Sequence, residues 1–205
     1  MALRILITAL ACYFLGNHNG AICVSVMLHD DVRNHGSGNA GLTNFIRNYG
    51  AQRSLMVIAI DVGKAVIGCL LGGLMFPEYP MAGKVLGGVF VMLGHDFPAL
   101  QGFRGGKGIL SGFIIALMID WRVGLIICAV FFTAYLLTRY VSLGSVLAAA
   151  AFGIGFWVLY PHDILVISGT SFMSILTIFQ HRANIVRLVK GQERKTNLLG
   201  KGKKQ

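Results

Sequence analysis

The chain has 205 residues, of which 55% are hydrophobic and only 13% are charged. This composition, with 27 glycines and a mean hydropathy of +0.69, excludes an ordinary soluble domain and indicates a membrane protein with closely packed helices. The net charge of +10 indicates contact with anionic lipid or an anionic substrate, not nucleic acid, because little of the chain can form a soluble basic surface. We therefore expect one membrane domain over residues 1–205.

Apolar runs succeed one another along the chain and predict an all-α integral membrane protein with about seven transmembrane helices. The runs cover residues 2–28, 54–76, 85–93, 109–119, 123–138, 143–160 and 164–179. The third and fourth are short for full crossings, so half-helices around a re-entrant loop, and five crossings, are the alternative. No clear cleavage site follows the first run, so we expect a retained span.

The positions of the cations predict the orientation in the membrane. With seven crossings and a cytoplasmic C-terminus, fourteen of the 18 Lys and Arg residues lie in the cytoplasm, three lie outside and one lies within a span. We therefore expect the N-terminus outside and a basic cytoplasmic tail at about residues 181–205. The segments at 29–50, 94–108 and 139–142 then share one membrane boundary with the tail, where we expect a binding site.

The first connection, residues 29–50, is rich in glycine and short polar side chains. Its candidate ligands are Ser37, Gly38, Asn39, Thr43, Asn44 and Arg47. If a helix begins at Gly41, the last three fall within its first two turns. Helix-start N–H groups, polar side chains and a guanidinium suit a phosphate or a polyol. The alternative is a surface loop with a helix N-cap.

The second apolar run contains Asp61 and Lys64, which lie three residues apart on one helical face. Charged groups inside a membrane face a cavity or each other, because an isolated charge in hydrocarbon costs roughly 2.5–3.5 kcal/mol. The two groups either form a self-satisfied pair or hold Lys64 toward an anionic ligand.

Residues 94–108 combine five glycines with His95, Arg104 and Lys107. Glycines let backbone N–H groups approach an anion closely, so this segment predicts a phosphate cradle. The alternative is a glycine-rich cytoplasmic loop. A nucleotide-binding P-loop is excluded because Gln101 replaces its first glycine and Gly108 replaces its Ser or Thr. His95 is a general base, a donor to substrate, or a residue at a helix end.

The last polar segments are a turn at residues 139–145 and the tail. Ser142 is either an N-cap or a ligand. The tail places Asn184, Arg187 and Gly191 on one helical face, with a lipid-binding basic helix as the alternative. We assign Lys201, Lys203 and Lys204 to anionic lipid.

Cofactor and metal chemistry find no support in the sequence. The four cysteines fall in apolar runs without metal-binding spacing, and the eight carboxylates include no paired-aspartate motif. We therefore expect neither a metal nor a cofactor.

These residues resemble the bacterial acyl-phosphate:glycerol-3-phosphate acyltransferases, the PlsY type. The family patterns GSGNxGxTNxxR, DxxK, GHxFPxxxxFxGGKG, VSLxS and HRxNIxRLxxGxE match residues 36–47, 61–64, 94–108, 141–145 and 181–193. Two departures exist: Gly16-Asn-His-Asn-Gly20 replaces a Gly-Ser-Ile-Pro segment, and Ala65 replaces a glycine.

The resemblance implies transfer of an acyl group from acyl phosphate to the 1-hydroxyl of glycerol 3-phosphate, giving lysophosphatidic acid and phosphate at the bacterial inner membrane. A peripheral enzyme would supply the acyl phosphate. The implied catalytic residues are His95, Lys107, Arg47 and Asn184. The implied substrate-binding residues are Ser37, Gly38, Asn39, Thr43, Asn44, Lys64, Gly102, Arg104, Gly105, Gly106, Gly108, Ser142, His181, Arg187 and Glu193.

The resemblance assigns the donor's phosphate to the loop at residues 102–108. It assigns the binding of glycerol 3-phosphate to the first connection, Lys64 and the tail. The hydroxyl proton goes to His95 or to a phosphate oxygen of the donor. The rival interpretation is a transporter or exchanger of phosphorylated metabolites, although no inverted repeat is evident. A lipid-scaffold protein is a third interpretation.

Overall fold

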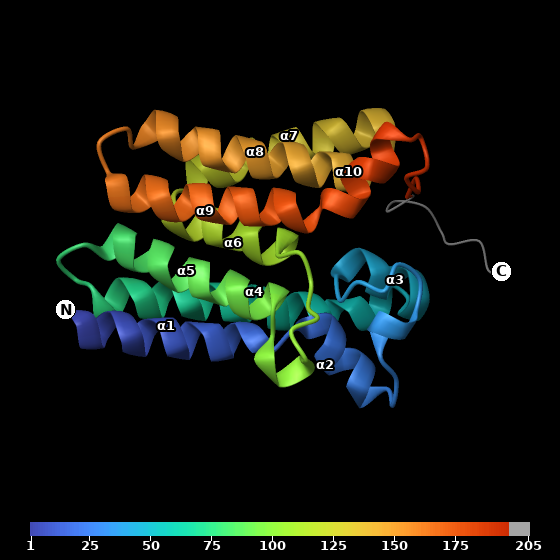
Figure 1. The fold of residues 1–205 in the computed structure, drawn as a ribbon, viewed down its shortest axis with the longest axis horizontal. Helices are drawn as coiled ribbons and strands as arrows, with labels where there is room; N and C mark the ends of the chain where they lie inside the picture. The colour runs from blue at the N-terminus through green and yellow to red at the C-terminus, as the bar shows by residue number, and fades with distance from the viewer. Residues whose placement is uncertain (197–205) are drawn as a thin grey trace.

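A computed structural model describes residues 1–196, which form ten α-helices and two short 3-10 turns without any β-strand (Figure 1). The helices are α1 (Ala2–Asn17), α2 (Gly20–Met27), α3 (Leu42–Tyr49), α4 (Ala51–Met75), α5 (Pro80–Asp96), α6 (Ile109–Ile119), α7 (Trp121–Thr138), α8 (Val141–Leu159), α9 (Ile164–Gln180) and α10 (Arg182–Val189). Each predicted apolar run overlaps a helix, and the short run at 85–93 is part of the longer helix α5. The three lysines assigned to lipid, at 201, 203 and 204, lie outside the described residues.

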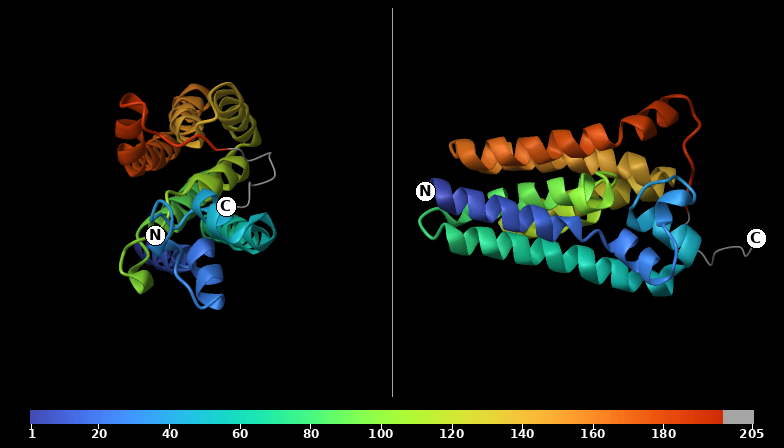
Figure 2. Two further views of the ribbon diagram at one scale, coloured as in Figure 1. Left: turned by 90° about the vertical axis from the view of Figure 1, so that its right-hand side faces the viewer. Right: turned by 60° about the horizontal axis from the view of Figure 1, so that its bottom comes forward.

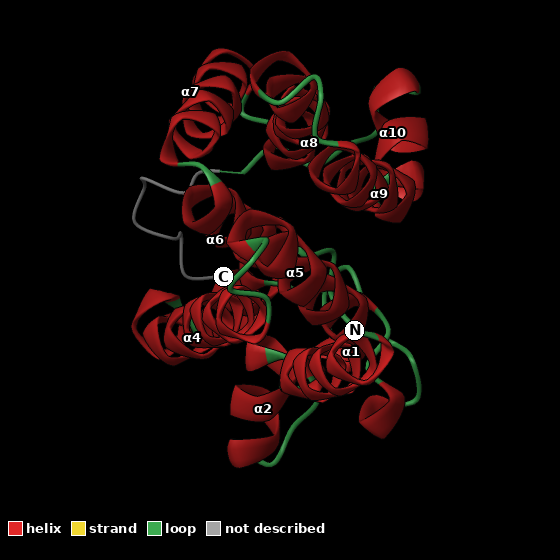
Figure 3. Ribbon diagram, turned by 90° about the vertical axis from the view of Figure 1, so that its left-hand side faces the viewer, coloured by secondary structure: helices red, strands yellow, loops and turns green. Residues whose placement is uncertain are grey.

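The helices form two groups, which Figure 3 separates in an end-on view. One group contains α1 to α6, and the other contains α7 to α10. Glycines allow close contact within the first group: a Cβ on Gly72 of α4 would lie only 2.0 Å from the carbonyl oxygen of Gly83 on α5. Helix α5 also packs against α9 and so joins the two groups.

The long helices run side by side, so the connections gather at two ends of an elongated molecule (Figure 2). At one end, called the far end, Arg4 pairs with Glu78 of the α4–α5 connection, and Arg122 at the start of α7 contacts Tyr160 after α8. At the opposite end, the site end, the backbone N–H of Thr196 donates to the carbonyl oxygen of Arg139. The connections at 28–41, 97–108 and 139–140 and the segment 181–196 all lie at the site end.

By length and apolar character, α4, α7 and α8 can each cross a membrane. The total is five if the bent pairs α1–α2 and α9–α10 each form one span, with bends of 44° and 54°. Helix α6 is a shorter apolar helix. The structure thus supports an all-helical membrane fold, while the expected number of seven crossings and the orientation stay predictions.

Candidate active site

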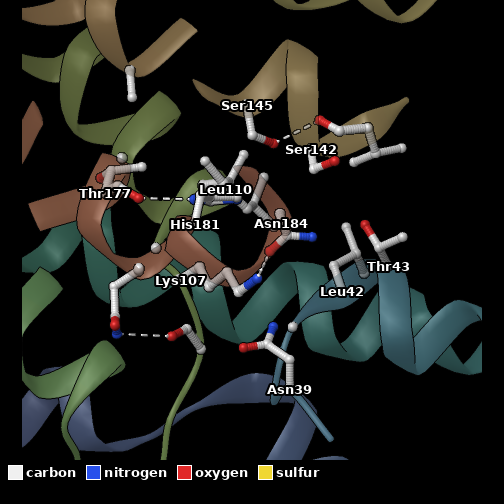
Figure 4. A pocket seen from close by; sticks show the side chains of 18 of the residues that line it. Asn39, Leu42, Thr43, Lys107, Leu110, Ser142, Ser145, Thr177, His181 and Asn184 are labelled. Carbon is white, nitrogen blue, oxygen red and sulfur yellow. Dashed lines mark hydrogen bonds between the residues drawn. The ribbon is translucent and has the colours of Figure 1, made fainter. Parts of the chain in front are cut away.

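A cavity of about 1110 Å³ opens at the site end, between the two helix groups. Every sequence-predicted site residue lines it except Lys64 and Gly102. Figure 4 shows Asn39 and Thr43 of the first connection across from Lys107 and Asn184. Four segments that are distant in the sequence therefore meet here, as the distribution of cations predicts.

The first connection is folded around Asn44 at the start of α3. The Asn44 side chain accepts a hydrogen bond from the N–H of Ser37 at 3.0 Å and donates to the carbonyl oxygens of Val32, His35 and Asn39. Gly36 has a φ of +60°, and a Cβ there would lie 2.3 Å from Asn44 Oδ1. Asn44 thus shapes this loop, and it leaves Ser37 and Asn39 to line the cavity.

The second glycine loop folds back onto the end of α5. The N–H groups of Gly105 and Gly106 donate to the carbonyl oxygens of Asp96 and His95, at 3.1 and 3.0 Å. These two N–H groups are therefore occupied, which differs from the simple phosphate cradle that the glycine content predicts. The loop instead presents Lys107 and the first turn of α6 to the cavity.

Four helices begin at the cavity without a side-chain N-cap: α3 at Leu42, α6 at Ile109, α8 at Val141 and α10 at Arg182. By contrast, Asn19, Asp120 and Asp163 cap α2, α7 and α9. The first N–H groups of a helix have no partner inside the helix and attract anions. The structure therefore places four helix N-termini at one cavity.

The segment after α10 is bonded to the cavity wall through the carboxylate of Glu193. Its Oε1 accepts hydrogen bonds of 2.8 Å from Ser142 Oγ and Asn184 Nδ2, and its Oε2 accepts one of 2.7 Å from Arg187 Nε. Burial acts to raise the pKa of Glu193, but these bonds outweigh it and the pKa lies below its usual value. Glu193 thus stays charged and orients three polar side chains.

Lys107 lines the cavity and contacts the side-chain oxygen of Asn184 (Figure 4). Burial, reinforced by the charge of Arg187, lowers the pKa of Lys107 to about 8. Further cations line the cavity: Arg47, Arg104, Arg182, Arg187 and Arg194. Such a cavity favours the binding of an anion, because an anion stabilises the ammonium group of Lys107 in place of the water that burial removes.

Two tail residues occupy positions that the sequence does not indicate. Helix α10 ends at Val189, so Gly191 lies beyond it, with a φ of +66°, and does not share the helical face of Asn184 and Arg187. Thr196, by contrast, lines the cavity and its hydroxyl contacts the guanidinium of Arg47.

Lys64 lies behind the cavity and not in its wall. Its Nζ is 2.7 Å from Asp61 Oδ1 and 2.7 Å from His95 Nδ1. The other ring nitrogen of His95 faces the backbone of Gly106, where a Cβ would lie 2.1 Å away. All three side chains are buried. This cluster therefore supports the second glycine loop from beneath.

Away from the polar end, the cavity continues between apolar side chains. Its walls are Phe113 of α6, Ile127 and Phe131 of α7, Phe152 of α8 and Met173 of α9. Phe152 lies ten residues beyond Ser142, so the apolar part extends about 15 Å along α8. One cavity thus combines a cationic end with a channel suited to an aliphatic chain.

Sequence reasoning missed Asp96, Thr177, Gln180 and Arg194 in the cavity wall. Gln180 has a structural contact, because its amide donates to the carbonyl oxygen of Gly106 at 3.4 Å. A signal for two of them existed: Asp96 directly follows His95, and Arg194 directly follows Glu193.

Comparison with known proteins agrees with this geometry. The pattern of the family described as "Glycerol-3-phosphate acyltransferase" matches residues 6–191. The chain belongs to this family. Proteins of that name from Finegoldia magna and Staphylococcus carnosus are 37% and 35% identical to it. The alignments cover 94% of this chain in both cases, and 96% and 98% of the two relatives.

Two solved structures have the same fold. They are crystal structures of PlsY (YgiH), an integral membrane glycerol 3-phosphate acyltransferase, in its glycerol 3-phosphate form and its lysophosphatidic acid form. Their TM-scores are 0.86 and 0.82, with 28% and 27% identity, and each covers 95% of this chain and 96% of the other. The family is thus one of acyltransferases, and this chain is an all-helical membrane enzyme within it.

Proposed function

We propose that this protein transfers a fatty acyl group from an acyl phosphate to the 1-hydroxyl of glycerol 3-phosphate, giving lysophosphatidic acid and inorganic phosphate. The observation that carries the proposal is a single cavity in which cations and four uncapped helix N-termini lead into an apolar channel. Two phosphates and one acyl chain match that arrangement. The glycerol 3-phosphate and lysophosphatidic acid forms of the PlsY structures support the acceptor and the product.

We assign one substrate to each loop. Lys107 and the N-terminus of α6 bind the donor's phosphate, with the acyl chain in the channel beside Phe131 and Phe152. The N-terminus of α3 and Arg47 bind glycerol 3-phosphate together with Asn184 and Arg187. Fixed N–H groups and cations stabilise negative charge without reorganisation during the reaction.

The reaction then needs mainly positioning, because an acyl phosphate is already activated. The acceptor's hydroxyl oxygen attacks the acyl carbonyl carbon, and the bond from that carbon to the phosphate oxygen breaks. The hydroxyl proton passes to the departing phosphate. His95 lies beneath Gly106, where Lys64 occupies one of its nitrogens, so we assign His95 a positioning role.

The membrane setting follows from the cations. We assign seven crossings to the chain and place its N-terminus outside the cell. The site end then lies on the cytoplasmic side of a bacterial inner membrane. A peripheral enzyme on that side supplies the acyl phosphate. The basic tail contacts anionic lipid.

The purified protein in detergent, given glycerol 3-phosphate and palmitoyl phosphate, tests the function. We expect phosphate release matched by lysophosphatidic acid, and no transfer from palmitoyl-CoA. Lys107→Ala should lower kcat/KM by roughly 10²–10³-fold, since it removes a preorganised charge. Lys190→Ala, an exposed cation outside the cavity wall, should retain activity. Absence of phosphate release, with glycerol 3-phosphate flux in proteoliposomes, would instead identify an exchanger.

A further inference from the structure

The break between α1 and α2 contacts both glycine-rich loops. The first loop is the first connection, residues 29–50, and the second loop is the second glycine loop, residues 97–108. Asn19 at the break donates from its side-chain amide to the carbonyl oxygen of Ala40 in the first loop, at 3.0 Å. Two residues earlier, Asn17 Oδ1 accepts a hydrogen bond of 3.1 Å from the N–H of Leu100 in the second loop. Tyr13 adds a bond of 2.8 Å from its hydroxyl to the carbonyl oxygen of Phe97. One short segment is therefore bonded to both loops.

The Asp61–Lys64 pair holds this break in place from α4. Lys64 Nζ donates to the carbonyl oxygens of Gly16 and His18, at 3.4 and 3.2 Å. Asp61 Oδ1 accepts from the N–H of Gly20 at 3.1 Å. Both sides of the break thus bond to one buried ion pair, which replaces the helix hydrogen bonds that the break removes.

Backbone contacts also fix the position of the break. A Cβ on Gly16 would lie 2.3 Å from the carbonyl oxygen of Val91 on α5, and one on Gly20 would lie 2.6 Å from that of Val57 on α4. The segment therefore sits directly on the two helices that carry the Asp61–Lys64–His95 cluster. It has little freedom to move independently of them.

Asn19 is the residue at which these contacts meet. It is fully buried and does not line the cavity, so it touches neither substrate site. Its side-chain oxygen caps α2 by accepting from the N–H of Ile22 at 3.2 Å, while its nitrogen reaches Ala40 and lies 3.5 Å from both ring nitrogens of His95. The side chain thus lies between the first loop and His95, the residue that supports the second loop.

We infer that Asn19 is a positioning residue that couples the two glycine-rich loops and so fixes the distance between the two bound substrates. The inference rests on the proposed function, in which each loop holds one substrate. Loss of this coupling leaves each binding loop intact but misplaces one substrate relative to the other. A misplacement of about 1 Å lowers a rate by about 10²-fold without requiring weaker binding.

Asn19→Ser tests the coupling because serine is also a good N-cap but has no amide to reach Ala40. We expect kcat to fall by roughly 10–100-fold, with both KM values close to those of the wild type. Asp163→Ala is the matched control: it removes the cap that accepts from Val166 at the far end and should leave kcat unchanged. An unchanged kcat in Asn19→Ser, or a rise in KM alone, would overturn the inference.

Two binding measurements separate positioning from misfolding. Calorimetry of Asn19→Ser should give the wild-type stoichiometry for glycerol 3-phosphate; a stoichiometry that falls in parallel with kcat contradicts the inference. In hydrogen exchange, glycerol 3-phosphate alone should protect residues 36–44 in both proteins but residues 97–106 only in the wild type. Equal protection of residues 97–106 in the variant also contradicts it. Because exchange needs no turnover, it tests the coupling even if the proposed acyl transfer fails.

Discussion

Lys107 carries a half-buried ammonium group near other cations, and its charge depends on pH within an accessible range. Burial lowers its pKa to about 8. Below that pH the group is protonated and attracts a phosphate; above it the attraction is lost. A bound phosphate raises the pKa again, because it favours the charged form. The ionisation therefore belongs to the free enzyme and affects kcat/KM more than kcat.

We predict that kcat/KM for the acyl phosphate falls above pH 8, by about tenfold per pH unit for loss of one proton. The measurement is a pH profile of phosphate release, corrected for hydrolysis without enzyme. Lys107→Arg provides the control, because arginine stays charged over this range. The variant should lose the alkaline decrease even if its absolute rate is lower. A decrease of the same slope in Lys107→Arg would show that another group titrates.

Glu193 shows what sequence reasoning at the residue scale misses. The motif match identifies Glu193, Ser142 and Asn184 as site residues, but it assigns Asn184 to catalysis and the other two to substrate binding. The structure joins them by hydrogen bonds across 51 and 9 residues of sequence. A carboxylate in a cationic cavity is explained only by these partners, and long-range partners do not appear in a local pattern.

At the scale of elements, apolar runs predict where helices lie but not how they are interrupted. The run at 109–119 coincides with α6, whereas the run at 2–28 divides into α1 and α2 at a bend of 44°. Asn17, His18 and Asn19 mark that bend, but its support comes from Asp61 and Lys64 on α4. The sequence predicts the Asp61–Lys64 pair correctly; that the pair binds the α1–α2 break follows only from tertiary packing.

Helix α8 extends from the polar end of the cavity along its apolar channel, so it should determine acyl-chain length. Ala148 lines the channel six residues beyond Ser142, about 9 Å along the helix. Ala148→Phe places a ring in the path of a long chain. We predict that kcat/KM for palmitoyl phosphate falls by at least about tenfold, equivalent to about 1.4 kcal/mol, while decanoyl phosphate is little affected.

Leu147→Phe is the matched control for this prediction. Leu147 is adjacent on α8 but 43% exposed and outside the cavity wall. It should accept a ring without any change in chain-length preference. If Ala148→Phe slows both donors equally, the acyl chain does not occupy the channel beside α8.

At the scale of the whole molecule, all the elements to which we assign phosphate binding lie at one end. The bonds of Thr196 to Arg139 and Arg47 gather the first connection, the α7–α8 turn and the tail there. The ion pair of Arg4 with Glu78 marks the other end. The count of cations, which needs no structure, separates the same segments into the same two sets. The sequence can predict this division because charge is distributed by connection and not by tertiary contact.

The orientation assigned above therefore makes a prediction for the whole chain. Alkaline phosphatase is active only outside the cytoplasm, where its disulfides form. Fusions that end after Glu78 or His162 should be active, and those that end after Arg53 or Arg139 inactive. A fluorescent protein at the C-terminus should fluoresce from the cytoplasm. The reverse pattern would place the cavity outside the cell, away from an intracellular supply of acyl phosphate, and the donor assignment would then fail with the topology.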